Sequence, residues 1–435
     1  MDSAGEDRTI PGRMISAHSP PEGEPDESAK PVRNWRAFLP FRMANTNRGP
    51  SDRWLLVVTL LLVGVGIVMI YSASAIRAQE RFGDPTFFLK KQLLYAFLGL
   101  LAMGWAVGRD LKTFQRLTPI LFLASLLLLM LVLVPHIGIR INGARRWLRF
   151  FGLSFQPAEL AKLATVLFLA SYFARRQDRI DDFLDGFLPP LCLSALMAVL
   201  IILQPNFGTA CILLFVAGVM FFVGGARIKH LLSTAGVALP VLLFLIVRSS
   251  HGRMRLLALL DPSRVSAKAT YQLDQSFYAL GPGGLFGRGL GDSMQKLYFL
   301  PEPHTDFIFA IVGEEMGFVG AMLVVLLFGA FLWRGMRAAI RAGDPYASYL
   351  AVGITSLTVG QAGLNMGVVS GLLPTTGVPL PFVSFGGSSL TLMLLGAGML
   401  LNISARTVPR EPGSVRPRYP EPDREVPYFR VAVRG

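Results

Sequence analysis

The sequence predicts an all-α, polytopic integral membrane protein with about ten transmembrane helices and a large extracytoplasmic loop between the seventh and eighth. Three observations predict this fold. Hydrophobic residues make up 52% of the 435-residue chain and charged residues only 16%, whereas soluble proteins carry roughly 25% charged residues. The apolar residues gather in stretches that approach the roughly 20 residues that a helix needs to cross a bilayer core. Proline and glycine interrupt the longest stretches, where helices have to end.

The spanning helices are predicted from ten apolar segments in chain order. Two charge-free stretches are long enough for two helices each, and both contain a Pro- and Gly-containing break, at residues 204–208 and 373–379. Such irregular backbone survives at membrane depth only inside protein or beside water. The predicted helices are 54–71, 92–108, 117–135, 159–174, 187–204, 208–224, 231–247, 307–333, 346–372 and 386–403.

An even number of helices places both termini on one side of the membrane, and the cations predict that this side is the cytoplasm. Short cytoplasmic loops are rich in Lys and Arg, and five cations precede the first helix with no acidic residue among them: Lys30, Arg33, Arg36, Arg42 and Arg48. We therefore expect a disordered cytoplasmic tail over residues 1–50, a membrane domain over 51–405 with a long outer loop at 248–306, and a disordered cytoplasmic tail over 406–435.

Charge and cysteine content exclude other classes. The net charge of +14 would suit a nucleic-acid-binding protein, but cations that flank membrane spans explain it more simply, so no nucleic-acid partner is expected. Cys192 and Cys211 both lie in apolar runs, without the spacing of a zinc site or a disulfide framework. We expect neither a metal nor a cofactor.

Two loops assigned to the outer face carry many cations. The long loop is exempt from the positive-inside rule, because long loops translocate despite their charge. The short loop at 136–158 is not exempt, and it carries Arg140, Arg145, Arg146 and Arg149. These cations predict an anionic ligand at the outer face. The alternative is that they bind outer-leaflet phospholipid headgroups.

Asp306 is the candidate general base. It follows Pro301 and Pro303 and stands at the outer end of the eighth predicted helix, where a low dielectric would raise the pKa of its carboxyl group towards neutrality. Alternatively, Asp306 merely caps the helix, a position that Asp favours. His304 is expected to be structural or a polar lining residue, because no second ligand at suitable spacing supports a metal.

Glu314 and Glu315 lie in the apolar part of the same helix, where charged residues usually face a cavity or a partner. Lys162 is their expected partner, and Glu159 precedes it by three residues on one helix face. Gln156 stands directly before the proline that starts this fourth helix. A substrate contact and a structural ion pair both remain open for these charges.

Three further features have two interpretations each. Trp147 could stack on a sugar ring or anchor the chain at the membrane interface. The glycine-rich segment 281–291 reads as a flexible outer loop that lets backbone approach a ligand, or as plain turn structure. The small residues at 382–389 permit close helix packing, and the N–H groups of the helix start could hold a phosphate.

These motifs make the chain similar to the SEDS family (shape, elongation, division and sporulation), and more to its division members than to its elongation members. The pairs Glu314–Glu315 and Gln295–Lys296 favour the division members. Thr376 and Phe385 depart from the pattern, because Lys and Tyr are frequent there. The resemblance covers about residues 50–405, through the segments 71–75, 142–148, 154–162, 204–209, 289–296, 300–317 and 374–389.

The resemblance implies an inverting peptidoglycan glycosyltransferase that polymerises lipid II into β-1,4 glycan strands and releases undecaprenyl pyrophosphate. Asp306 would be the catalytic base. The implied substrate contacts are Arg145, Arg146, Trp147, Gln156, Glu159, Lys162, Lys296, His304, Glu314 and Glu315.

The resemblance also implies a setting. The protein would lie in the bacterial cytoplasmic (inner) membrane at the division septum, with its active site on the outer face. A class B penicillin-binding protein, which is a transpeptidase, and other division proteins would be its partners. Three alternatives stay open: an elongation-type polymerase, a lipid II flippase and a non-catalytic scaffold of the division machinery.

Overall fold

The computed structural model describes residues 49–406, except 142–143, 151–152, 181, 262, 264 and 298. All of them lie in one compact unit, Met43–Gly435. The two tails are predicted to be disordered. Almost all of their residues, 1–48 and 407–435, lie outside the described residues.

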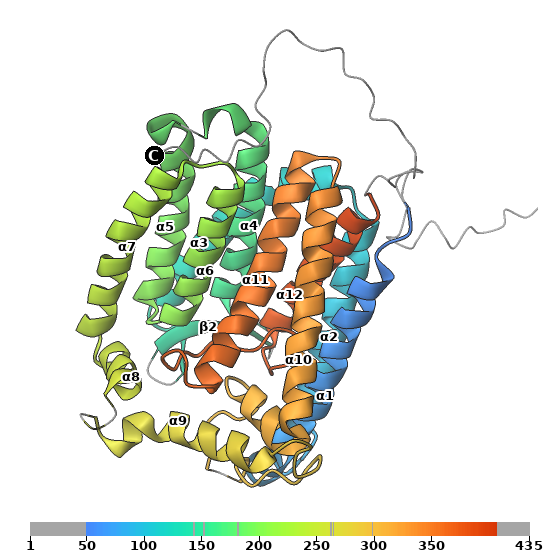
Figure 1. The fold of residues 1–435 in the computed structure, drawn as a ribbon, viewed down its shortest axis with the longest axis vertical. Coiled ribbons are helices and arrows are strands. Elements are labelled where there is room, and N and C mark those ends of the chain that lie inside the picture. Colours follow the sequence, from blue (N-terminus) through green and yellow to red (C-terminus); the bar gives the residue numbers. More distant parts are fainter. Residues whose placement is uncertain are drawn as a thin grey trace, which may run out of the picture. The chain divides into compact units, whose positions relative to one another are not determined.

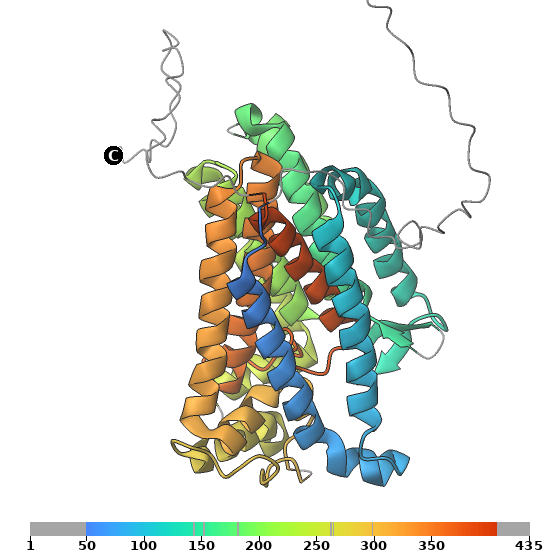
Figure 2. The same cartoon turned by 90° about the vertical axis from the view of Figure 1, so that its right-hand side faces the viewer.

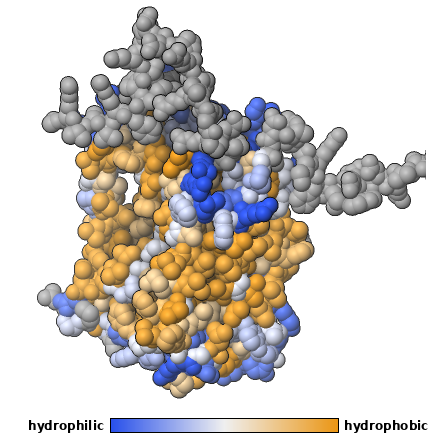
Figure 3. Space-filling view, turned by 45° about the vertical axis from the view of Figure 1, so that its right-hand side comes forward, coloured by the Kyte–Doolittle hydropathy of each residue, from blue (hydrophilic) through white to orange (hydrophobic). Residues whose placement is uncertain are grey.

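The fold is a bundle of long helices (Figure 1), and each predicted helix corresponds to one of them. Eight described helices are long and apolar enough to cross a bilayer, and α6 and α12 are shorter apolar helices. Figure 3 shows a broad apolar belt on one face of the bundle, with hydrophilic surface at the lower end. The bundle helices are α1 (Arg53–Phe82), α2 (Phe87–Gly108), α3 (Leu111–Leu133), α4 (Pro157–Arg175), α5 (Leu188–Leu203), α6 (Phe207–Val223), α7 (Ile228–Arg248), α10 (Ile308–Arg341), α11 (Pro345–Val369) and α12 (Ser388–Ser404).

Local sequence explains where these helices begin and end. Asp52 caps α1, because its carboxylate accepts the N–H groups of Trp54 and Leu55. Gly83 ends α1 with a φ of 71°, a conformation that favours glycine. α1 therefore runs beyond its predicted end at residue 71. Pro157 lies in the first turn of α4, as predicted.

α4 is the central helix and α7 the peripheral one. α4 contacts α3, α5, α6, α11 and α12, and most of its residues are buried. α7 has no buried residue and stands at the edge of the bundle in Figure 1. On the far side, α1 packs against α10 and α2 packs against α12, as the turned view in Figure 2 shows.

The two loops that are predicted to lie on the outer face contain secondary structure that the sequence did not predict. The short loop holds a small antiparallel sheet in the order β1-β2-β3, with β1 (Ile139–Ile141), β2 (Ala144–Phe150) and β3 (Leu153–Phe155). The long loop holds α8 (Ser250–Leu260) and α9 (Ala267–Leu280). The short 3₁₀ and π turns are at Gln177–Arg179, Phe183–Phe187 and Gly281–Gly283.

The glycine-rich segment packs against α10 instead of standing free for a ligand. α10 breaks at Gly317, whose φ is 67°, and there Phe318 N–H donates to the Gly284 carbonyl at 2.9 Å. A Cβ on Gly287 would lie 2.1 Å from the Glu315 carbonyl oxygen, so only glycine permits this approach. The prediction of a flexible loop that approaches a ligand is therefore wrong at Gly284 and Gly287, because their backbone packs against α10.

Candidate functional site

Asp306 lies at the end of the long outer loop, directly before α10. The cap position of α10 is Phe307, and no side chain forms a capping hydrogen bond there, so Asp306 is not the helix cap. Its backbone carbonyl accepts a hydrogen bond from Asn365 Nδ2 of α11 at 2.7 Å. The same amide donates to the Val378 carbonyl at 2.8 Å. Asn365 thus ties the Asp306 backbone to the loop between α11 and α12, which leaves the partly buried Asp306 side chain for chemistry.

Two arginines act on the Asp306 carboxylate. Arg146 from β2 and Arg255 from α8 both attract it electrostatically. A Cβ placed on Gly377 would lie 3.4 Å from Asp306 Oδ2 and 3.9 Å from Arg146 Nη1, so the carboxylate and the guanidinium border the same space beside this glycine. Arg146 is oriented by the backbone after α5, since it donates from Nε to the Gln204 carbonyl at 2.9 Å and from Nη2 to the Pro205 carbonyl. The Gln-Pro break predicted from sequence thus positions a cation.

Burial raises the pKa of Asp306 to about 7, and the nearby Glu302 carboxylate adds to the rise. Arg255 and Arg146 oppose it. A carboxyl group with a pKa near neutrality can accept a proton in a reaction and release it afterwards. The site thus combines a candidate proton acceptor with two cations that could hold an anionic group.

Glu159 and Lys162 form a buried ion pair, with Lys162 Nζ 2.8 Å from Glu159 Oε1. Lys162 is 2% exposed and Glu159 3%. Lys162 also donates to the Gln361 side chain, whose Nε2 donates to the Pro379 carbonyl at 2.9 Å. Ser389 Oγ donates to the other oxygen of Glu159 at 2.7 Å. The pair therefore supports the loop between α11 and α12, and the expected pairing of Lys162 with Glu314 or Glu315 is wrong.

Glu314 and Glu315 instead hold the outer loop to the bundle. Glu314 accepts hydrogen bonds from Ser293 Oγ at 2.5 Å and from the Met294 N–H at 2.8 Å. Glu315 accepts from Ser72 Oγ of α1 at 2.6 Å and pairs with Lys296 Nζ at 3.0 Å. Both glutamates are almost completely buried. Their oxygens are occupied by protein groups that fix the segment leading to Asp306.

The remaining predicted residues lie around the site without converging on it. Arg145 and Trp147 flank Arg146 in β2, where the pairing with β1 has a register shift: Arg145 pairs with Arg140 and Trp147 with Ile139. The Gln156 N–H donates to Ser388 Oγ at 3.0 Å, which joins α4 to α12. His304 packs between Phe88 and Phe385, with ring centroids 4.6 and 5.9 Å away, and burial lowers its pKa to about 4. In the described part of the chain, no group of three or more His, Cys, Asp or Glu side chains is placed to hold a metal.

Sequence reasoning missed Arg255, Gln361, Asn365 and Ser72. A signal existed for the residues of α11, because polar side chains in a spanning helix usually have a functional or structural partner, and Gln361 and Asn365 stand one turn apart. Arg255 was one of seven cations in the long loop, and nothing in the sequence distinguished it from the other six.

The buried Glu159–Lys162 pair leads to a prediction about unfolding free energy. Lys162→Met removes one charge and leaves the Glu159 carboxylate buried without its cation, which should cost about 3–5 kcal/mol of unfolding free energy. Glu159→Gln together with Lys162→Met should recover a large part of this loss. Thermal unfolding of the purified variants in detergent measures both. Equal stability of Lys162→Met and the wild type would contradict the assignment of a supporting pair.

A family of cell cycle proteins, which comprises FtsW, RodA and SpoVE, matches residues 53–408 of this chain. Stage V sporulation protein E of Bacillus subtilis (strain 168) is 44% identical over 359 residues, which cover 82% of this chain and 98% of that protein. The probable peptidoglycan glycosyltransferase FtsW of Geobacter sp. (strain M18) is 42% identical over 355 residues, which cover 82% of this chain and 97% of that protein.

Solved structures are similar as well. The crystal structure of the rod shape determining protein RodA of Thermus thermophilus has a TM-score of 0.59 at 30% identity, and covers 81% of this chain and 96% of that one. A chain from a structure that describes the coordination of polymerization and crosslinking by a peptidoglycan synthase complex has a TM-score of 0.67 at 31% identity, and covers 81% of this chain and 97% of that one. These similarities confirm the resemblance that the sequence motifs indicate.

Proposed function

This chain belongs to the FtsW/RodA/SpoVE family of cell cycle proteins, and on that premise we propose that it is a peptidoglycan glycosyltransferase that polymerises lipid II. The observation that carries the proposal is the Asp306 carboxyl group beside Arg146, with a pKa raised to about 7. Two relatives support the reaction class, since one is named a probable peptidoglycan glycosyltransferase and another belongs to a peptidoglycan synthase complex.

In the proposed reaction, the 4-hydroxyl of a lipid-linked GlcNAc attacks C1 of MurNAc on the donor strand. Asp306 accepts the hydroxyl proton as the new C–O bond forms. The bond from C1 to undecaprenyl pyrophosphate breaks, and the pyrophosphate leaves with the bonding electrons. Direct displacement inverts C1 and gives a β-1,4 linkage. Arg146 and Arg255 stabilise the negative charge that develops on the leaving group.

The other predicted site residues divide into two groups in this proposal. Arg145 and Trp147, which flank Arg146 in β2, contact the sugar or pyrophosphate of the second substrate. Gln156 and His304 contribute to the shape of the site through their packing. The buried charges hold in place the two loops that carry the site: Glu159, Lys162, Lys296, Glu314 and Glu315. Protein groups occupy their polar atoms, so these residues do not contact the substrate in this proposal.

We also propose how the protein is oriented in the membrane and which partner it works with. The site faces outward, both termini lie in the cytoplasm, and the carrier lipid lies along the apolar faces between the helices. A class B penicillin-binding protein crosslinks the new strand, and the complex works at the division septum. Among the relatives, the structure of a synthase that couples polymerization to crosslinking supports this partner.

Polymerisation of lipid II by the purified full-length chain tests the function. We expect glycan strands from the wild type when its penicillin-binding partner, carrying an inactivated transpeptidase site, is present. A folded chain that makes no strands under these conditions would contradict the proposal. Transport of labelled lipid II across proteoliposomes by such a chain would instead establish the flippase.

The pH dependence tests the role of Asp306. A base acts in its ionised form, so kcat/KM should be constant well above pH 7 and fall about tenfold per pH unit below it. Glu302→Gln removes a charge that raises the pKa of Asp306 and should move this acidic limb to lower pH. Arg255→Gln removes an opposing charge and should move it to higher pH. If the acidic limb of the kcat/KM profile lies at the same pH in the wild type and in both variants, the limb does not report the titration of Asp306.

A further inference from the structure

A pocket lined by arginines lies at the end of the bundle opposite Asp306. α4 starts beside the site and runs for 19 residues to Arg175, which at 1.5 Å per residue carries the chain roughly 28 Å away. There the last turns of α4 and the first turns of α3 enclose a pocket of about 390 Å³. None of the residues that line it takes part in the proposed reaction.

Three arginines line this pocket: Arg116, Arg175 and Arg176. Arg176 lies over the Tyr172 ring at 5.3 Å and donates to the Asp185 carbonyl at 3.4 Å. Arg116 and Arg175 are exposed and form no ion pair with any carboxylate in the part of the chain that the structure describes. Among the described residues, the pocket therefore presents at least two cations that no carboxylate neutralises.

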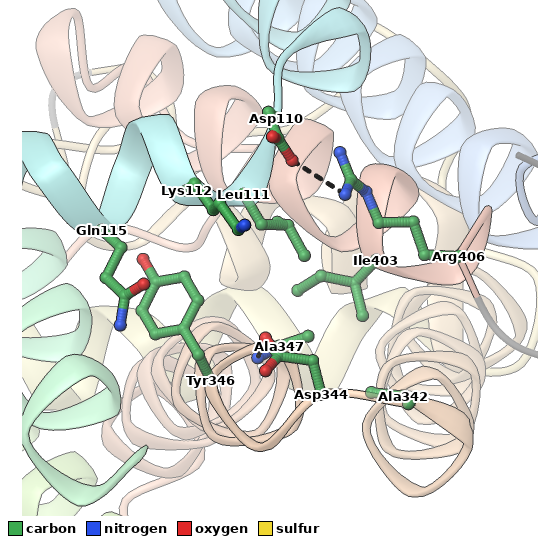
Figure 4. A pocket seen from close by; sticks show the side chains of 11 residues that line it. Asp110, Leu111, Lys112, Gln115, Ala342, Asp344, Tyr346, Ala347, Ile403 and Arg406 are labelled. Carbon is green, nitrogen blue, oxygen red and sulfur yellow. Dashed lines mark hydrogen bonds and ion pairs between the residues drawn. The ribbon is translucent and has the colours of Figure 1, made fainter. Parts of the chain in front are cut away.

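The neighbouring pocket at this end shows the contrast. It lies between the start of α3, the link from α10 to α11 and the end of α12, and shares Gln115 with the arginine pocket. Its arginine is already paired, because Arg406 Nη1 lies 2.9 Å from Asp110 Oδ1 (Figure 4). An anion at Arg406 would have to displace that carboxylate, whereas Arg116 and Arg175 have no carboxylate partner among the described residues.

An exposed apolar stripe leads from the arginine pocket along α3. Ile120, Leu123 and Leu127 are 63%, 56% and 56% exposed, and they follow Arg116 at intervals of four, three and four residues, on one helix face. Phe168, Tyr172 and Pro119 line the pocket beside its cations. A cation followed by an apolar stripe that faces the bilayer matches the order of groups in a phospholipid, phosphate first and acyl chain next.

We infer that this pocket binds an anionic phospholipid, with its phosphate at Arg116 and Arg175 and an acyl chain along Ile120, Leu123 and Leu127. The helix dipole accounts for Arg175 without a ligand, because cations stabilise the C-terminal end of a helix. It does not account for Arg116, which stands near the N-terminal end of α3, where a cation gains nothing from the dipole. The site is independent of the proposed enzymatic reaction.

Binding can be measured on the full-length chain in nanodiscs and by native mass spectrometry with phosphatidylglycerol or phosphatidylcholine. We expect the wild type to retain phosphatidylglycerol preferentially and to unfold at higher temperature in its presence. Arg116→Gln/Arg175→Gln should lower the affinity roughly tenfold. The matched control is Lys229→Gln/Arg341→Gln, which removes two cations at the ends of α7 and α10, outside this pocket, and should retain the preference.

Three further comparisons distinguish a lipid site from its alternatives. An equal loss in the control variant, or no preference in the wild type, would overturn the site, because general surface charge would then explain the cations. A full thermal shift with inorganic phosphate alone would overturn a lipid ligand in favour of a free anion. If the Gln variant is unfolded, Arg116→Lys/Arg175→Lys keeps both charges. Loss of the lipid preference in that folded variant would support contact of the two guanidinium groups with the phosphate, and an unchanged affinity would contradict it.

Discussion

Asp306→Asn is expected to lower the rate of lipid II polymerisation by about 10²–10⁴-fold, the range that a positioned general base contributes. Asn has the same shape but cannot accept the hydroxyl proton. The substitution leaves the backbone carbonyl that Asn365 binds in place, so the loop should keep its position. Glycan strands separated on gels, with turnover measured at saturating lipid II, give the rate.

Stability separates lost chemistry from lost folding in this variant. Because the folded protein holds the pKa of Asp306 at about 7, above its ordinary value of 3.8, the folded state binds more protons than the unfolded state between these values. Stability therefore falls as pH rises through this range, and at pH 8 the wild type carries the cost of a buried charge. Asp306→Asn avoids that cost and should unfold at a temperature no lower than the wild type does.

A matched carboxylate supplies the control. Asp292 lies in the same outer loop and is exposed, so Asp292→Asn changes the charge equally without touching the site and should polymerise normally. Full activity of Asp306→Asn, or equal loss in both variants, would remove Asp306 from the catalytic role.

The helices could be predicted from sequence because their signal is local. Apolar length and the Pro-containing breaks located all ten, and Pro157 marked the start of α4. Asp306 could be named as a candidate base because the prolines that precede it and its place at the start of a helix are also local features. Its raised pKa was expected from position alone, and the burial that causes it is present.

The partners of the buried charges could not be predicted, because they depend on how distant segments pack. Glu315 meets Ser72, which is 243 residues away in sequence, and Lys162 meets Gln361, which is 199 residues away. Sequence spacing favours a pair within one helix, as it did for Glu159 and Lys162, and is silent about contacts between helices. The outer sheet escaped prediction for a related reason, since three-residue strands such as β1 and β3 are too short to show a period.

Asn365 gives the second large effect, because it positions Asp306 without touching substrate. Asn365→Leu keeps the branching and the number of heavy atoms of the side chain but removes the donor to the Asp306 and Val378 carbonyls. These buried carbonyls lose their partner, which should cost about 1–3 kcal/mol of stability. The carboxylate should shift within the site, and since misplacement by about 1 Å can cost 10²-fold in rate, we expect kcat to fall by at least tenfold with KM little changed.

The chain contains a matched control for this clamp at the other end of the bundle. Asn402 is equally buried, and its Nδ2 donates to two backbone carbonyls, of Ala106 and Arg109, each at 2.6 Å. Asn402→Leu should therefore lose similar stability but keep kcat, because α12 ends far from Asp306. If the two variants lose activity in parallel with stability, Asn365 is only a packing residue. If Asn365→Leu alone loses kcat at equal folded fraction, the position of the Asp306 backbone sets the rate.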